Sequence, residues 1–462
     1  MQNIIQELTN QLGAEKILLG EAVSKRFHHI WTMHVPLKAK AVVLPTCTKD
    51  VAATLKICHK HGQEVIVHGG LTNLVGSTQT TENQIVISIE KLNAIEEVDV
   101  CSRSMTVGAG VVLQQIQQAA QANELQFPLN FGAKGSAQIG GIIATNAGGL
   151  RVLRYGMTRQ QVLGLEVVLP DGTILSNLKK IIKDNSGYDL KQLFIGSEGT
   201  LGIVTKAVLR LHEAPRSRCS AWVGIKDYKN VLAFLRFIDK GLAGALSAYE
   251  LVWKETFRTM TSPPSTMKSP LPLDYGYYVL VENLGGDQNK DTETFESILE
   301  IALQKNLIED AVLANNSADL AWFWQIREDV RVLSAQADND HHFDISMPPP
   351  LIGEYVEAVS GDLRQIEEVE EIFTFGHIAD GNVHHIIGKK NDSAELTKRI
   401  NDIVYGKIAT VGGSVSAEHG IGLDKKAYLH HSRTPAELEL MKTLKRALDP
   451  KNILNPGRIF DF

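Results

Sequence analysis

Residues 132–149, GAKGSAQIGGIIATNAGG, are the stretch of sequence on which the choice of fold depends. Glycine alternates there with alanine, serine and threonine, so little side-chain volume covers the backbone. A backbone of this kind allows another group to approach it closely. The pattern therefore predicts a loop with a bulky group lying against its main chain.

Two further glycine loops lie on either side of this stretch in the sequence. Residues 69–76, GGLTNLVG, follow a strand-like run at 64–68, and residues 196–202 read GSEGTLG. Backbone N–H groups in such loops can cradle a phosphate, and several loops together can surround a large phosphate-bearing cofactor. The alternative is that each loop is only a tight turn. The segment GAGVVL at 108–113 lacks the last glycine of the dinucleotide fingerprint and is interpreted as a strand-to-helix turn.

The sequence around the first loop predicts mixed α/β layers rather than a helical bundle. A strand is expected at 41–45, followed by an amphipathic helix over 50–60. Asp50 is the expected N-cap of this helix, and Gly62 is its expected left-handed stop. Alternation of strands with a helix is typical of a layered α/β domain.

Composition and charge exclude several classes of protein. The chain has 462 residues, a formal net charge of −6 and 44% hydrophobic residues, which allows two or three globular domains. Because no Lys/Arg-rich block is present, a nucleic-acid partner is not expected. The sequence contains no run of 18 apolar residues, so no transmembrane helix is expected. The N-terminal 20 residues lack the pattern of a signal peptide, so a cytoplasmic location is expected, with the four separated cysteines reduced.

Histidines cluster in the last quarter of the chain. The segment GHIADGNVHH contains His377 and His384, and the segment SAEHGIG contains Glu418 and His419. Two histidines and one glutamate can bind Zn²⁺ or a similar divalent ion and leave a position open for a substrate. His419 can then act as a proton acceptor. The alternative is that these side chains only cap loops, since neither H-x-x-E-H nor H-E-x-x-H is present.

Taken together, these segments resemble a known family. Five segments carry the resemblance, in this order along the chain: ATNAGGLR, GYDLKQLFIGSEGTLGI, GHIADGNVHH, SAEHGIG and LDPKNILNPGRIF. The similarity covers nearly the whole chain. These segments resemble the FAD-linked D-2-hydroxyacid dehydrogenases of the vanillyl-alcohol-oxidase-type FAD fold. The resemblance is stronger to the D-2-hydroxyglutarate dehydrogenases than to the D-lactate and glycolate dehydrogenases. The resemblance implies an α+β chain with a PCMH-type FAD-binding domain at 1–215 and a FAD-linked-oxidase C-terminal α+β substrate domain at 216–410. A segment at 411–462 would return to the FAD-binding domain with the metal and base loop.

The resemblance also implies which residues contact FAD. The first loop would hold the pyrophosphate, the second would pass along the flavin, and the third would lie near the adenosine or ribityl part. The implied cofactor-binding residues are Gly69, Gly70, Thr72, Asn73, Leu74, Ser136, Ile139, Gly140, Gly141, Asn146, Gly148, Gly149, Glu198, Gly199, Ile203 and Asn455. Some relatives attach the flavin through a histidine inside the first loop. Here His68 precedes the loop, so non-covalent FAD is expected.

The resemblance implies a reaction as well. The metal ligands would be His377, His384 and Glu418, with Zn²⁺ as the favoured ion, and His419 would be the base that accompanies hydride transfer to flavin N5. The implied substrate-binding residues are Arg327, Arg331, His342 and His384. The family's pattern has Thr, Lys and Asn where this chain has Arg331, His342 and Ile386, so the sequence leaves two alternatives for the far end of the substrate. It is either a distal carboxylate or a shorter or differently shaped acid.

Partners and alternative functions follow from the same reading. A small 2-hydroxy acid is the expected substrate, an electron-transfer flavoprotein or a quinone is the expected acceptor with oxygen as a further option, and related enzymes suggest a homodimer. A metal-dependent hydrolase is the first alternative, but it leaves the three glycine loops unexplained. A flavoprotein that only carries electrons is the second, and it predicts that His419→Ala changes nothing.

Overall fold

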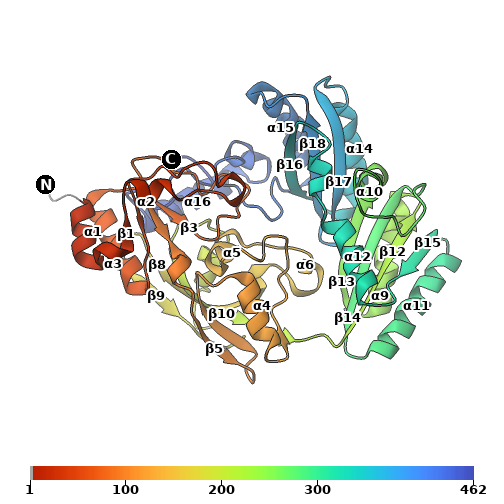
Figure 1. The fold of residues 1–462 in the computed structure, drawn as a ribbon, viewed down its shortest axis with the longest axis horizontal. Helices are drawn as coiled ribbons and strands as arrows, with labels where there is room; N and C mark the ends of the chain where they lie inside the picture. Colours follow the sequence, from red (N-terminus) through yellow and green to blue (C-terminus); the bar gives the residue numbers. More distant parts are fainter. Residues whose placement is uncertain (1–3) are drawn as a thin grey trace. The chain divides into compact units, whose positions relative to one another are not determined.

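The structure, a computed structural model, describes residues 4–462 in two compact units (Figure 1). The first unit takes in the chain up to Gly149, then Tyr155–Ala214 and Glu418–Phe462. The second unit consists of Leu150–Arg154 and Pro215–Ala417. The chain therefore enters the second unit twice, and the short Leu150–Arg154 segment departs from the continuous 1–215 domain expected from the sequence.

The first unit begins with a four-stranded sheet in the order β1-β2-β4-β3. Its strands are β1 (Ile17–Leu18), β2 (Ala41–Val43), β3 (Val65–His68) and β4 (Ile85–Ser88). β4 pairs in parallel with β2 and β3, and the chain connects β2 to β3 through helix α3 (Thr48–His61). The α/β layering expected from the sequence is confirmed in this part of the chain.

Helix α3 begins earlier than its sequence suggested. Its N-cap is Cys47, so the prediction that Asp50 caps the helix was wrong. Asp50 lies in the first turn, where its carboxylate accepts a hydrogen bond from the Thr46 N–H at 2.9 Å and pairs with Lys16 at 2.7 Å. A carboxylate in the first turn of a helix satisfies free N–H groups much as a cap does, which explains the misplacement. The end was predicted correctly, because Gly62 has φ 62°.

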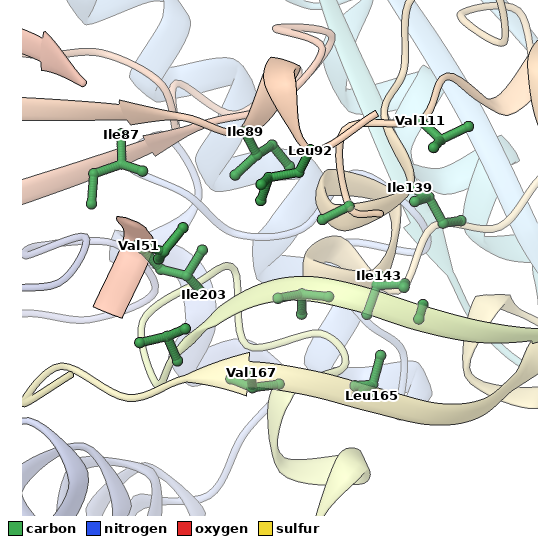
Figure 2. Packing of buried hydrophobic residues seen from close by; sticks show 14 of the residues in the cluster. Val51, Ile87, Ile89, Leu92, Val111, Ile139, Ile143, Leu165, Val167 and Ile203 are labelled. Atoms are coloured by element: carbon green, nitrogen blue, oxygen red, sulfur yellow. The ribbon is translucent and has the colours of Figure 1, made fainter. Parts of the chain in front are cut away.

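A second, antiparallel sheet of the first unit has the order β5-β6-β10-β8-β9. Its strands are β5 (Ile95–Asp99), β6 (Ser104–Gly108), β8 (Val162–Val168), β9 (Ile174–Asn177) and β10 (Ile203–Arg210). Figure 2 shows part of the apolar core to which this sheet contributes, including Val51 of α3, Ile203 and Val167. Ile139 and Ile143 of helix α5 (Ile139–Thr145) enter the same core. The glycine-rich stretch is thus held by packing on one side of α5.

The second unit is built on a seven-stranded antiparallel sheet in the order β15-β12-β14-β13-β17-β18-β16. Its strands are β12 (Ser217–Ile225), β13 (Leu246–Trp253), β14 (Tyr277–Gly285), β15 (Asp310–Leu313), β16 (Asn339–Ser346), β17 (Val369–His377) and β18 (Asn382–Lys389). Helices α10 (Lys254–Thr261), α12 (Ser317–Glu328) and α13 (Arg331–Ser334) pack their apolar residues on one face of this sheet. Trp222, Tyr278 and Phe375 are core residues of that face.

The remaining elements complete the two units. They are α1 (Ile4–Leu12), α2 (Glu21–Ser24), α4 (Leu113–Gln121), β7 (Leu125–Gln126), α6 (Val152–Tyr155), α7 (Thr158–Gln161), α8 (Lys191–Phe194), β11 (His212–Glu213), α9 (Tyr228–Leu242), α11 (Gln288–Gln304), α14 (Ile352–Leu363), α15 (Ala394–Ile408) and α16 (Pro435–Leu448). No helix among residues 4–462 combines the length and the apolar character that crossing a bilayer would require.

His68, the last residue of β3, makes the first unit sensitive to acid. Its ring is 2% exposed and bonds the Thr78 carbonyl at 2.9 Å, and burial lowers the pKa to about 4. Below the ordinary pKa of 6.5 the unfolded chain binds a proton that the folded chain refuses, so stability is lost as pH falls from 6.5 towards 4. Between pH 7 and pH 5, we expect the free energy of unfolding of His68→Gln to fall by about 2 kcal/mol less than that of the wild type, as measured by urea unfolding. The exposed His430→Gln serves as the control.

Candidate functional site

The first glycine loop is held in one shape by the side chain of Asn73. Its Oδ1 accepts the N–H of Ser77 at 2.9 Å, and its Nδ2 donates to Thr78 Oγ1 at 2.6 Å. In the same loop, Thr72 is half-buried and Leu74 is 39% exposed. The loop is therefore a preformed turn at the end of a parallel strand, where backbone groups are available to a ligand.

Glycine is required where the first and second loops meet. A Cβ at Gly70 would lie 2.1 Å from the Ser136 carbonyl oxygen, so only glycine fits there. A Cβ at Gly69 would lie 3.7 Å from Gly141 Cα, which places these two backbones side by side. Gly141 itself would meet nothing within 4 Å. The two loops thus leave open space beside Gly141, as a cradle for a bound group requires.

Gln138 supplies an unsatisfied polar atom beside this cradle. Its side-chain Oε1 is buried and has no hydrogen-bond partner among the described residues, and it lies 3.8 Å from the Cβ position of Gly69. A buried acceptor without a partner costs about 1–3 kcal/mol. A bound group that donates a hydrogen bond at this point would remove that cost. Sequence reasoning missed Gln138, although it is the polar residue that immediately precedes α5.

Several of the residues expected to contact a cofactor have structural roles in this chain. Ile139 and Ile203 are 0% and 2% exposed and belong to the hydrophobic core. A Cβ at Gly140 would lie 2.7 Å from Ile89 Cδ1. The left-handed residue Asn146 accepts the N–H of Arg159 at 2.9 Å. Any ligand contact of these four residues would therefore come from the backbone or from the exposed side of a group already packed.

The turn that ends the second loop also needs glycine. Gly148 and Gly149 are both buried. Gly149 has φ +137°, and a Cβ there would lie 2.2 Å from the Asn130 carbonyl oxygen. This turn delivers the chain directly to the Leu150–Arg154 segment of the second unit.

Glu198 connects three segments of the first unit. Its carboxylate accepts the N–H groups of Ile421 at 2.6 Å and Gly422 at 2.8 Å, and the hydroxyl of Ser77 at 3.1 Å. Burial raises the pKa of Glu198, and the backbone hydrogen bonds from Ile421 and Gly422 oppose that rise. The carbonyl of Glu198 accepts Asn455 Nδ2 at 2.8 Å. Glu198 thus fixes the loop that follows Glu418 and His419.

The third glycine loop and Asn455 complete this arrangement. Gly199 has φ +67°, and a Cβ there would lie 2.7 Å from Asn455 Nδ2. Asn455 Oδ1 in turn accepts the Val67 N–H of β3 at 2.9 Å. The third loop is therefore joined to the strand that leads into the first loop.

The expected metal ligands lie together in the structure. One donor atom each from His377, His384 and Glu418 can be chosen so that all three lie within 4.8 Å of one another. The rings of His377 and His384 are nearly perpendicular, with centroids 5.4 Å apart. Glu418 directly follows Ala417, and Asp344, Glu418 and His419 form a second group of the same size. Two imidazoles and one carboxylate suit a divalent ion that keeps an open position for substrate.

A buried carboxylate lies behind each histidine. Glu250 on β13 accepts His377 Nδ1 at 2.7 Å, and Asp344 on β16 lies 3.8 Å from His384 Nδ1. Asp344 also accepts the Ala417 N–H at 3.1 Å. Burial alone would raise the pKa of Glu250, but the nearby charges of His377 and Arg327 outweigh it and lower the pKa. Carboxylates in this position hold metal-binding histidines in the orientation that a metal needs.

The expected substrate-binding residues are placed differently from one another. Arg327 on α12 is 4% exposed, and its Nε donates to Glu250 Oε2 at 2.9 Å. Arg331 is exposed and begins α13, whereas Arg327 belongs to α12, which ends at Glu328. His342 bonds Asp340 at 2.7 Å. Ile386 is 2% exposed in the core, on β18 opposite His342.

Sequence reasoning gave no role to Glu250 or to Asp344. Glu250 is 1% exposed in the largely apolar strand LSAYELVW, and Asp344 is 0% exposed between Phe343 and Ile345. A carboxylate in the middle of an otherwise apolar strand must find a partner when the strand is buried. That signal was present in the sequence, but the partners come from other strands and from α12.

Comparison with known proteins places the chain in a family. Residues 39–177 match the family described as FAD binding domain, and residues 214–459 match the family described as FAD linked oxidases, C-terminal domain. The solved structure of an alkyldihydroxyacetonephosphate synthase superposes with a TM-score of 0.76, covering 98% of this chain and 84% of that chain. At 16% identity, this likeness concerns the fold alone. The chain belongs to the FAD-linked oxidase family and is a flavoprotein oxidoreductase of the vanillyl-alcohol-oxidase-type fold.

Curated relatives narrow the class further. The mitochondrial D-2-hydroxyglutarate dehydrogenase of Bos taurus is 37% identical over 436 residues, covering 93% of this chain and 78% of the relative. A Schizosaccharomyces pombe (strain 972 / ATCC 24843) protein with the provisional name of a mitochondrial D-lactate dehydrogenase is 36% identical over 439 residues, covering 93% and 83%. The expectation of a cytoplasmic location was wrong, since these relatives are named as mitochondrial. The N-terminal composition tested only for a secretory signal.

Proposed function

We propose that this flavoenzyme oxidises a D-2-hydroxy acid to the 2-oxo acid, with non-covalent FAD and a divalent metal ion. Zn²⁺ is the favoured ion. The observation that carries the proposal is the grouping of His377, His384 and Glu418 donor atoms within 4.8 Å, with His419 next in the chain. The relatives named as D-2-hydroxyglutarate and D-lactate dehydrogenases support the substrate class.

The cradle at Gly69, Gly70 and Gly141 fits a flavin cofactor. The open space beside Gly141 and the unsatisfied Gln138 Oε1 are both suited to a large group with hydrogen-bond donors. FAD, when bound, accepts a hydride at N5. Non-covalent attachment is supported by His68, whose ring is buried and already bonded to Thr78.

The residues around the metal group have separable roles. His377, His384 and Glu418 would hold the divalent ion. The ion, when bound, lowers the pKa of a hydroxyl that it coordinates. His419 takes the proton of the substrate hydroxyl, because an imidazole titrates near neutral pH. Glu198 keeps the following loop in place through Ile421 and Gly422, which limits the motion of His419.

Arg327 is the proposed anchor of the substrate carboxylate. Its guanidinium donates one hydrogen bond, from Nε to Glu250, and the buried Nη2 has no hydrogen-bond acceptor of regular geometry among the described residues. A guanidinium carries five donors, so an edge remains for a second carboxylate. The ring of Phe375 packs against the guanidinium, with the ring centroid 4.7 Å from Arg327 Cζ.

The far end of the substrate pocket is the part that sets the choice among D-2-hydroxy acids. Ile386 offers only apolar surface where the relatives' pattern has an amide, and His342 is bonded to Asp340. Both changes reduce the donors available to a distal carboxylate. An electron-transfer flavoprotein or a quinone as acceptor, and a homodimer, are proposals carried over from the resemblance.

The function is tested by anaerobic flavin bleaching near 450 nm with a panel of D- and L-2-hydroxy acids, repeated after chelation. Bleaching by D-acids that is lost with chelator supports the proposal. Bleaching by D-2-hydroxyglutarate would mean that the pocket accepts a distal carboxylate, and bleaching by D-lactate alone would mean that it has been narrowed. Bleaching by no 2-hydroxy acid would refute the proposed reaction.

Gly141 provides a test of where the cofactor lies. We expect Gly141→Ala to stabilise the apoprotein by about 0.5–1 kcal/mol, because a helical alanine replaces a glycine whose Cβ position is open. The same methyl group would crowd the bound flavin and weaken FAD affinity by about 5-fold to 100-fold. Thermal unfolding of the apoprotein and FAD fluorescence titration measure the two effects.

Gly140→Ala is the matched control for Gly141→Ala. Its Cβ would meet Ile89 and Ala109 at 2.7 and 2.8 Å, so it should destabilise the apoprotein by about 1–3 kcal/mol. If Gly141→Ala leaves FAD affinity unchanged, the cofactor does not lie against this residue.

A further inference from the structure

Glu250 is a charged residue in the middle of the seven-stranded sheet. It lies on β13 between β14 and β17, and it is 1% exposed. A carboxylate buried in this way persists only when its oxygens find charged or hydrogen-bonding partners. Its two oxygens face two different partners, His377 and Arg327.

The first partner is a proposed metal ligand. Glu250 stands directly opposite His377 in the register of β13 and β17, and its Oε1 lies 2.7 Å from His377 Nδ1. An ionised carboxylate can only accept, so His377 Nδ1 carries the proton and Nε2 keeps its lone pair. This hydrogen bond sets both the tautomer and the ring orientation of the histidine.

The second partner is the proposed substrate anchor. Glu250 Oε2 accepts Arg327 Nε at 2.9 Å and lies 2.8 Å from Arg327 Nη2. The carboxylate therefore faces one edge of the guanidinium. The Arg327 side chain makes no other hydrogen bond to a described residue, so its remaining donors are available to an acceptor on the other edge.

We propose that Glu250 is a positioning residue that orients His377 for the metal through one oxygen and Arg327 for the substrate carboxylate through the other. The inference rests on the proposed function, and it deepens that function by making metal affinity and substrate affinity depend on one side chain. Glu250 touches neither the reacting atoms nor the cofactor in this role. It acts through the two residues that it holds.

Glu282 on β14 offers a matched comparison. It is 0% exposed and is bound by Arg151, Arg218 and Ser247, so it is a buried ion pair in the same sheet without a histidine partner. A substitution there removes a buried charge as Glu250→Gln does. It should disturb stability without changing the orientation of His377.

The structure makes the expected effect of Glu250→Gln directional. Arg327 offers only donors, so the new amide will turn its oxygen towards Arg327 and its NH₂ group towards His377. His377 Nδ1 must then accept, which moves the ring proton to Nε2 and removes the metal-binding lone pair. Arg327→Met, by contrast, leaves the Glu250 to His377 hydrogen bond in place.

The test measures Co²⁺ binding to the FAD-loaded protein, by competition titration and by visible absorption of the bound ion, and the KM for the D-acid that bleaches the wild-type flavin. We expect Glu250→Gln to weaken Co²⁺ affinity by about 10-fold to 100-fold, change the absorption spectrum and raise KM. Glu282→Gln should leave Co²⁺ affinity within about threefold of wild type. Arg327→Met should raise KM and keep Co²⁺ affinity, which separates the two roles of Glu250.

The outcomes distinguish this inference from the proposed function. A Glu250→Gln protein with wild-type Co²⁺ affinity and spectrum would overturn the inference and leave the metal site standing. A wild-type protein that binds no Co²⁺ would overturn the metal part of the proposed function, and the inference with it. If Glu250→Gln does not fold, the double variant Glu250→Leu/Arg327→Met removes both charges of the buried pair and leaves His377 Nδ1 without its acceptor, so it carries the same test of Co²⁺ affinity and spectrum.

Discussion

Replacement of His419 by alanine is expected to reduce kcat by about 100-fold to 10,000-fold while FAD stays bound. His419 lies within the group that includes Asp344 and Glu418, with donor atoms no more than 4.8 Å apart, and it is the imidazole proposed to take the substrate proton. FAD should remain because the residues of the glycine cradle are untouched. Stopped-flow flavin reduction and the bound-flavin absorbance measure the two quantities on one sample.

The control for this prediction is His430→Ala, an exposed histidine in the same part of the chain. It bonds only the nearby Ala427 carbonyl at 2.9 Å, so flavin reduction should be unchanged. A His419→Ala enzyme with undiminished flavin reduction would remove His419 from the mechanism and favour a protein that only carries electrons.

Loss of a metal ligand should have an effect of similar or greater size. Either Glu418→Ala or His384→Ala removes one of three donors, and we expect bound divalent metal to fall below stoichiometry and turnover to fall at least about 1,000-fold. Metal analysis of the purified variants and steady-state assays with and without added Zn²⁺ measure the result. Chelation of the wild type should reproduce it and be reversed by metal.

His385→Gln is the comparison for the metal-ligand variants. This residue follows His384 on β18, but its side chain is buried with Nδ1 bonded to Thr374 at 3.1 Å, and burial lowers the pKa to about 4. Its replacement should cost stability and leave metal content near that of the wild type. Full activity in a Glu418→Ala protein without metal would show that the reaction needs no ion.

Local patterns predicted the first part of the fold well. The glycine stop at Gly62 and the strand expected at 64–68 follow from rules that act within a few residues, and the structure has Gly62 at the helix end and a strand at Val65–His68. The start of α3 was misplaced because a first-turn carboxylate and an N-cap perform the same task. No local sequence pattern indicates that Leu150–Arg154 belongs to the second unit. Arg151 is bound by Glu282 and Arg154 by the Leu284 carbonyl, and both partners lie more than a hundred residues later in the chain.

The candidate site divides along the same line. Residue types and spacing made His377, His384, Glu418 and His419 candidates beside a loop-capping alternative, the resemblance implied their roles, and the structure groups their donor atoms. Ile139 and Ile203 were named by resemblance, but the position of their side chains in the core depends on how α3, α5 and two sheets meet. Glu250 was missed because its role is defined by a cross-strand neighbour and by α12.

The division of the chain also dictates an order of assembly during synthesis. Almost all of the second unit, Pro215–Ala417, is translated before residues 418–462 exist. The first unit cannot close until then, because the Val65 N–H bonds Ile453, Val67 bonds Asn455, and the buried Lys445 bonds the Thr200 carbonyl. The nascent first unit must therefore wait, with one edge of its parallel sheet unprotected, while some two hundred residues emerge from the ribosome. Chaperone demand during translation should accordingly concentrate on the N-terminal half of this protein.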